Sequence, residues 1–134
     1  MAVSKPSSLK KNQKILLAED EAMIRELIAT FLSNKGYTVH ESENGRQSLE
    51  QAMAIGADQI SLLITDLVMP VMGGLELASK LRKIQPELRV LYISGYTDDL
   101  VVLEGESRTK TAFLRKPFSF ETLGQRVESL LAQE

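Results

Sequence analysis

The chain contains no cysteine, which excludes disulfide bonds and thiolate metal sites and fits a reducing compartment. It also lacks a run of about 20 apolar residues, the length that a membrane-spanning helix requires. The first residues contain lysines but no apolar segment of a secretory signal. The net charge is only −2, so no overall positive field attracts nucleic acid or an anionic membrane. These absences predict a cytoplasmic domain that contacts neither nucleic acid nor a membrane.

Motifs for nucleotide binding are missing as well. The sequence has no P-loop, no GxGxxG and no basic stripe with interleaved aromatic residues. Its 134 residues suffice for one domain with one hydrophobic core and are too few for two ordinary domains. Residues 1–13 are rich in Ser, Lys and Pro, so we expect a disordered N-terminal tail followed by a single domain over residues 14–134.

Two patterns alternate along that domain. Short apolar runs rich in β-branched residues predict buried strands at Ile15–Ala18, Tyr37–His40, Ile60–Ile64, Val90–Ile93 and Ala112–Leu114. Apolar residues at helical spacing lie between and after them, in stripes beginning at Ile24, Leu49, Leu77 and Leu123. A further helix, short because of Gly105, is predicted within Asp98–Lys110. This alternation predicts an α/β fold, a doubly wound five-stranded parallel sheet with five helices on its two faces.

The ends of the predicted strands carry polar groups. The first strand is followed by Glu19 and Asp20, the third by Asp66, the fourth by Ser94 and the fifth by Lys116. Binding groups of open α/β sheets collect beyond the carboxyl ends of the strands. We therefore expect three carboxylates, one hydroxyl and one ammonium group at one edge of the sheet.

Three neighbouring carboxylates repel one another unless a cation lies among them. An all-oxygen site without His or Cys suits a hard ion, so the grouping predicts Mg²⁺ or Mn²⁺. Glu21 fits better as an acid at the start of the following helix, where negative charge is favourable. Asp66 could act as a nucleophile on phosphorus, with Lys116 and Ser94 binding the phosphoryl oxygens.

Four segments, "ILLAEDE", "LLITDLVMPVMGGLEL", "VLYISGYTDD" and "AFLRKPF", resemble the signature blocks of the response-regulator receiver domain of two-component phosphorelays. They occur in the family's order from Lys14 onward, and the last two are most similar to receivers of hybrid sensor histidine kinases. The resemblance implies a flavodoxin-like (βα)5 fold with strand order 2-1-3-4-5.

The resemblance also implies roles for individual residues. Asp66 would be the phosphoacceptor, and Mg²⁺ would be bound by Asp20, Asp66, the Val68 backbone carbonyl and, through water, Glu19. Ser94 would be the switch hydroxyl, Phe113 the switch aromatic and Lys116 the phosphoryl-binding lysine, with a cis peptide bond before Pro117.

Three positions depart from the commonest family pattern. Glu19 replaces Asp, Phe113 lacks the hydroxyl of Tyr, and Val68 cannot hydrogen-bond an attacking water. The last departure predicts a long-lived phosphoryl group.

The implied function is a phosphoacceptor switch and not a conventional enzyme. It would receive a phosphoryl group from a histidine kinase or a histidine phosphotransfer protein, lose it slowly, and signal through the face of the fourth helix, fifth strand and fifth helix. A Mg²⁺-dependent phosphatase is an alternative, but the second acid that such enzymes need two residues past the nucleophile is Val68 here. A flavin module is another, although Glu19-Asp20-Glu21 would repel a phosphate.

Overall fold

A computed structural model describes residues 13–95 and 110–133 of the chain. Two expectations fall largely outside them: the tail over residues 1–13, of which only Gln13 is described, and the helix within Asp98–Lys110, of which only Lys110 is described.

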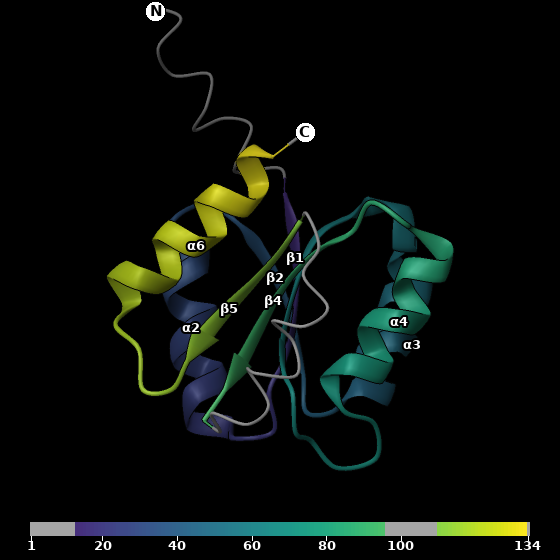
Figure 1. The fold of residues 1–134 in the computed structure, drawn as a ribbon, viewed down its shortest axis with the longest axis horizontal. Coiled ribbons are helices and arrows are strands. Elements are labelled where there is room, and N and C mark those ends of the chain that lie inside the picture. The colour runs from purple at the N-terminus through teal and green to yellow at the C-terminus, as the bar shows by residue number, and fades with distance from the viewer. Residues whose placement is uncertain (1–12, 96–109, 134) are drawn as a thin grey trace, which may run out of the picture.

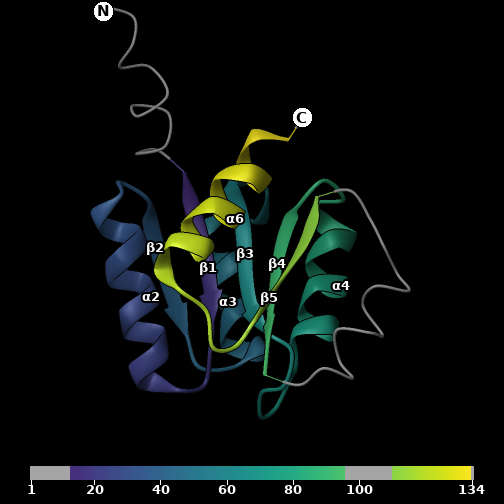
Figure 2. The ribbon, with the colours of Figure 1, turned by 60° about the vertical axis from the view of Figure 1, so that its left-hand side comes forward.

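The sheet has five parallel strands, as predicted. They are β1 (Lys14–Ala18), β2 (Thr38–Ser42), β3 (Ile60–Asp66), β4 (Arg89–Ser94) and β5 (Thr111–Arg115). Their order across the sheet is β2-β1-β3-β4-β5, with every neighbouring pair parallel (Figure 2). This order confirms the doubly wound, flavodoxin-like fold.

Helices cover both faces of the sheet. Helices α2 (Ala22–Asn34) and α6 (Phe120–Ala132) lie on one face, and α3 (Gly45–Ile55) and α4 (Gly74–Ile84) lie on the other (Figure 1). A short 3-10 helix, η2 (Ala57–Gln59), precedes β3. The described residues thus contain four of the five predicted α-helices, and none of the four is long and apolar enough to cross a membrane.

Alternating strand residues supply a core on each face. On β3, Leu62 and Ile64 pack beneath α2 and α6, whereas Leu63 packs beneath α3 and α4. All three are fully buried, as expected for strands covered on both sides. Because both faces of the sheet are covered, functional side chains on the central strands reach solvent at the ends of the strands.

The amino edge of the sheet is tied together by arginines. Arg89 at the start of β4 donates from Nε to the carbonyl of Leu130 at 2.7 Å and from Nη2 to the carbonyl of Gln133. The side chain of Gln133 accepts a bond from the backbone N–H of Lys110 at 2.8 Å, and Arg82 Nη2 donates to the Lys110 carbonyl at 3.1 Å. These bonds fix the end of α6 against β4, and Lys110, just before β5, against α4 and Gln133.

Candidate functional site

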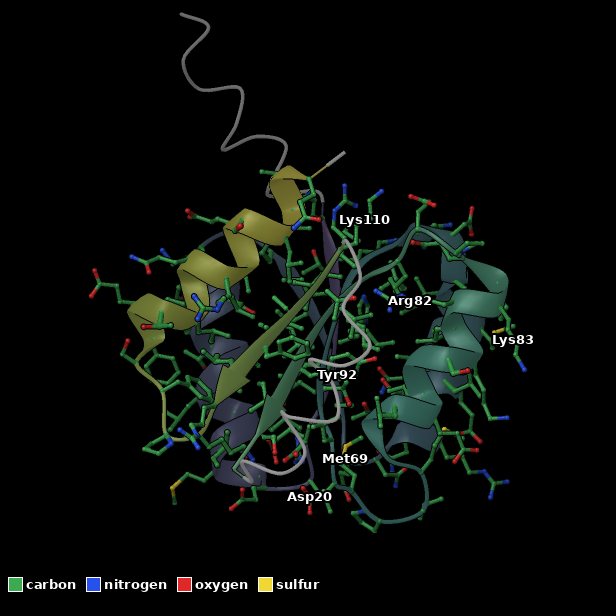
Figure 3. All side chains as sticks on the ribbon, in the orientation of Figure 1. Asp20, Met69, Arg82, Lys83, Tyr92 and Lys110 are labelled. Carbon is green, nitrogen blue, oxygen red and sulfur yellow. The ribbon has the colours of Figure 1, made fainter. Side chains whose placement is uncertain are left out.

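The polar residues predicted from the strand ends lie at the carboxyl edge of the sheet. Glu19 and Asp20 follow β1, Asp66 and Ser94 end β3 and β4, and Lys116 follows β5. Since β1, β3, β4 and β5 are consecutive across the sheet, their ends are neighbours. Figure 3 shows Asp20 at one end of the molecule and Lys110, from the amino edge, at the other.

Three carboxylates form a compact cluster at this edge. One oxygen each from Glu19, Asp20 and Asp66 lies within 4.8 Å of the others. Glu19 is fully buried, Asp66 is 7% exposed and Asp20 is open to solvent. The cluster borders a pocket of about 460 Å³ lined by Asp20, Glu21, Asp66, Val68, Gly95 and Lys116.

Lys116 is the ammonium group of the site. Its Nζ donates to Asp66 Oδ2 at 2.8 Å and lies 3.0 Å from Glu19 Oε1. A third carboxylate oxygen, Glu21 Oε1, accepts from the same Nζ at 3.2 Å. Burial by itself lowers the pKa of Lys116, but its hydrogen bond to Asp66 and the negative charges of Asp66 and Glu19 outweigh burial, so the net pKa is raised. The lysine is therefore a permanent cation in the site.

Glu19 is held at the bottom of the cluster. Its Oε2 accepts a hydrogen bond from the backbone N–H of Glu21 at 3.0 Å, and its carbonyl accepts one from Arg25 Nη1 at 2.8 Å. Burial raises the pKa of Glu19 to about 7, and the charge of Asp66 adds to this against the opposing effects of the Glu21 N–H and Lys116. A cation bound at the cluster would favour the ionised form of Glu19.

The loop after β3 fixes the orientation of Asp66. The backbone N–H of Val68 donates to Asp66 Oδ1 at 3.2 Å, and the N–H of Gly74 donates to the Leu67 carbonyl at 3.0 Å. A side chain at Gly74 would collide with the Asp66 carbonyl, which explains glycine at the start of α4. The two Asp66 oxygens are thus bound differently, Oδ1 by the backbone and Oδ2 by Lys116.

The other predicted site residues lie around this centre. Ser94 is buried, and its carbonyl accepts from the backbone N–H of Lys116 at 2.8 Å. Phe113 on β5 is half-buried, with its ring stacked on Tyr92 at a centroid distance of 6.3 Å. The Lys116–Pro117 peptide bond is cis. Ser94 thus stands on β4, the strand next to that of Asp66, and Phe113 on β5, one strand further out; the Lys116 backbone is bonded to the end of β4.

The donor set fits a hard divalent cation. The described pocket offers carboxylate oxygens, and Lys116 is the only cation among its lining residues. Glu19 Oε1 is buried, with an ion pair to Lys116 but no aligned hydrogen bond among the described atoms. One lysine cannot neutralise so many acids, so the site suits Mg²⁺ better than a neutral ligand or an anion.

Sequence reasoning missed the contact of Glu21 with Lys116. Glu21 is the N-cap residue of α2, but its side chain makes no capping hydrogen bond and turns to Lys116 instead. The acidic helix start was visible in the sequence, whereas the direction of a capping side chain is set by what lies opposite it. The hydrogen bond from Arg25 to the Glu19 carbonyl was also missed, because the sequence pattern indicates only that Arg25 lies off the apolar stripe of its helix.

The sequence matches the response regulator receiver domain family over residues 15–128, and the chain belongs to this family. Receiver domains accept a phosphoryl group on an aspartate, bind Mg²⁺ at an acidic cluster, and work with histidine kinases or phosphotransfer proteins as switches.

Two relatives are similar to this chain over most of its length. It is 34% identical over 132 residues to the sensor kinase CckA of Brucella abortus, covering 98% of this chain but only 14% of the kinase. It is 33% identical over 119 residues to the response regulator receiver protein CpdR of the same organism, covering 89% of this chain and 97% of CpdR.

Solved structures of response-regulator receivers are also similar to this chain. The receiver domain of the hybrid histidine kinase CckA is 36% identical with a TM-score of 0.75, covering 88% of this chain and 98% of that domain. The response regulator TrrA of Thermotoga maritima, solved with Mg²⁺ and BeF, is 28% identical with a TM-score of 0.76 over the same shares of the two chains.

Proposed function

We propose that Asp66 is the phosphoacceptor of a two-component phosphorelay. The observation that carries this proposal is the 2.8 Å contact between Asp66 Oδ2 and Lys116 Nζ at a pocket bordered by two further acids. A carboxylate so placed borders the pocket and lies next to a cation that can bind the incoming phosphoryl oxygens. The donor would be a phosphohistidine of a histidine kinase or a histidine phosphotransfer protein.

The transfer exchanges one bond to phosphorus for another. A lone pair of an Asp66 carboxylate oxygen forms the new O–P bond while the N–P bond of the phosphohistidine breaks. The electron pair of that bond stays on the ring nitrogen, and a ring protonated on its other nitrogen leaves as neutral imidazole. As negative charge moves from the Asp66 carboxylate to the phosphoryl oxygens, Lys116 Nζ would exchange its contact with Asp66 Oδ2 for one with a phosphoryl oxygen. The lysine would therefore contact an anionic oxygen throughout the reaction.

Asp20, Asp66 and the backbone carbonyl of Val68 would hold the Mg²⁺ directly, with Glu19 acting through water. When bound, the ion supplies positive charge that stabilises the phosphoryl oxygens in the transition state. The chain's own contribution is to keep the three acids close together, which burial of Glu19 and the loop bonds to Asp66 accomplish.

The signal would leave the site through Ser94 and Phe113. A phosphoryl group on Asp66 offers a hydrogen-bond acceptor to the Ser94 hydroxyl, and movement at the end of β4 changes the space beside the Phe113 ring on β5. The population of conformations then shifts on the face formed by the predicted fourth helix, β5 and α6; that helix was predicted within Asp98–Lys110, of which only Lys110 is described. We place this signalling in the cytoplasm, where the ATP of histidine kinases is available.

Labelling by a small phosphodonor tests the proposal. Incubation with acetyl phosphate and Mg²⁺ should add one phosphoryl group to the wild type, measured as intact mass, and none to Asp66→Asn. Asp58, an exposed acid before β3, supplies the matched control, because Asp58→Asn should be labelled as the wild type is. Labelling of Asp66→Asn, or repeated turnover of a phosphate ester by the wild type, would contradict the proposal, the second by indicating a phosphatase.

The phosphoryl group should be long-lived. Val68 lines the pocket with an apolar side chain that is 56% exposed, so it cannot orient a water for attack on phosphorus. Val68→Asn places an amide there and should accelerate hydrolysis several-fold, on the order of the effect of one positioned hydrogen bond. The decay of phosphorylated protein in Mg²⁺, followed by intact mass, measures it, and loss within seconds from the wild type would contradict the hypothesis.

A further inference from the structure

Lys116 has three N–H bonds and three carboxylates in contact with it. Two of these, Glu19 and Asp66, belong to the acidic cluster, and the third is Glu21, with its Oε1 at 3.2 Å from Nζ. Glu21 lies outside the group of three acids whose oxygens converge, and its side chain is 60% exposed at the mouth of the pocket. It therefore contacts the phosphoryl-binding cation without taking part in the metal cluster.

The contact is not explained by the helix that Glu21 begins. Its side chain makes no capping hydrogen bond to α2, although N-cap residues usually stabilise a helix in that way. The bonds that fix this turn come from its backbone: the Glu21 N–H donates to Glu19 Oε2, and its carbonyl accepts from the N–H of Arg25 at 2.9 Å. Replacing the side chain leaves both backbone bonds in place.

We propose that Glu21 is a selectivity residue that disfavours small, highly charged anionic phosphodonors at the pocket. This inference rests on the proposed phosphorylation of Asp66. The carboxylate acts in two ways: it adds negative charge at the entrance, and it occupies a donor of Lys116 that an incoming phosphoryl oxygen needs. A protein donor can offset the repulsion with contacts elsewhere on its surface, whereas a free small anion cannot.

The charge of the donor determines the size of the effect. A unit charge about 6 Å from the Glu21 carboxylate in water-like surroundings experiences a repulsion that changes a rate about threefold for each additional charge on the donor. Acetyl phosphate is a dianion at neutral pH and transfers its phosphoryl group with loss of acetate. Phosphoramidate is a monoanion that loses ammonia. The ratio of the two labelling rates therefore reports the charge at the pocket mouth, and differences in overall activity cancel in it.

The experiment compares this ratio in three proteins at neutral pH, in Mg²⁺ and at low ionic strength. Glu21→Gln should raise the acetyl phosphate to phosphoramidate rate ratio about threefold over the wild type. Glu26→Gln, which removes the same charge from an exposed position on α2 outside the pocket lining, should leave the ratio unchanged. In about 1 M salt, where the Debye length is about 3 Å, the difference between Glu21→Gln and the wild type should disappear.

Glu21→Ser is a second neutral variant, which keeps the test valid if Glu21→Gln folds poorly, because serine can cap α2. An unchanged ratio in a folded neutral variant, or an equal change in Glu26→Gln, overturns the inference while labelling of Asp66 leaves the proposed function intact. If no protein is labelled by either donor, the proposed function itself fails and the selectivity falls with it.

Discussion

Glu19 is a carboxylate with no exposure to solvent, and its environment raises its pKa to about 7 from an ordinary value of 4.5. The folded chain thus retains a proton that the unfolded chain has already lost between these two pH values. Retaining it means that the free energy of unfolding of the metal-free protein decreases as pH rises from about 4.5 to about 7. The same residue thus links folding to pH and belongs to the proposed metal site.

Added Mg²⁺ should reverse this loss. The ion needs the ionised carboxylate, so its stabilising effect should grow as pH rises through about 7. Thermal unfolding with EDTA and with Mg²⁺, from about pH 5 to about pH 8, measures the difference in Tm. Glu19→Gln should flatten this pH dependence, whereas Glu26→Gln should retain it. A Mg²⁺ effect of equal size at every pH in the wild type would contradict the interpretation.

Among the elements, the junction between the loop after β3 and the start of α4 should be sensitive to a small change. A Cβ at Gly74 would meet the Asp66 carbonyl and would lie 3.0 Å from Thr65 Cγ2, both in the packed interior. Neither group can move freely, so Gly74→Ala should lower the free energy of unfolding by roughly 1–3 kcal/mol. Because the shifted backbone belongs to Asp66, labelling by acetyl phosphate should also slow.

Gly95 offers the matched control for this loop. Among the described residues, a Cβ there would meet only Lys116 Cβ, at 3.9 Å, which is an ordinary contact. Gly95→Ala should therefore stay within about 0.5 kcal/mol of the wild type in urea unfolding. Equal stability of the two alanine variants would mean that the backbone after β3 is less constrained than its contacts indicate.

The elements also show what the sequence could and could not predict. All five strands were found from apolar runs, but β3 continues through Thr65 to Asp66 and β4 includes Arg89 and Ser94, polar ends that periodicity does not detect. Helix α3 begins at Gly45, before its apolar stripe, because the Asn44 side chain caps it by accepting from the Gln47 N–H at 2.9 Å. Helix η2 has no periodic signal, since three residues are too few for one.

The acidic cluster was predictable because strand ends in a parallel sheet converge whatever the side chains are. The ion pair between Glu21 and Lys116 was not, because it joins residues 95 positions apart through side chains whose direction depends on packing. Local sequence patterns identify the helices, the strands and the end of the sheet where the site lies. Individual side-chain contacts within the site depend on how the chain packs in three dimensions.

At the scale of the whole molecule, the carboxyl and amino ends of the parallel strands differ in what they carry. The carboxyl edge carries the pocket, and the amino edge carries the bonds from Arg89 to the end of α6. Arg89→Ala should lower the free energy of unfolding by about 1–2 kcal/mol, because charged hydrogen bonds to two carbonyls are lost. Labelling of Asp66 should keep its wild-type rate, since the change lies at the opposite edge.

Arg46→Ala is the matched comparison for Arg89→Ala. Arg46 is exposed, and its one ion pair within residues 13–95 and 110–133 is the i,i+4 pair with Glu50 at 3.6 Å, so its loss should change stability by less than about 0.5 kcal/mol. Urea unfolding and the labelling rate together test the division between edges. A slowed labelling rate in folded Arg89→Ala would show that the two edges are coupled.

The described chain begins and ends at the same edge of the sheet. Lys14 opens β1 there, and the last turn of α6 is bound there by Arg89 (Figures 1 and 2). A tether joined directly to Gln13 or Gln133, the first and last described residues, would therefore attach on the side away from Asp66. A molecule immobilised through such a tether would present the pocket around Asp66 outward, so binding of a donor protein could be measured in that orientation without steric interference from the support.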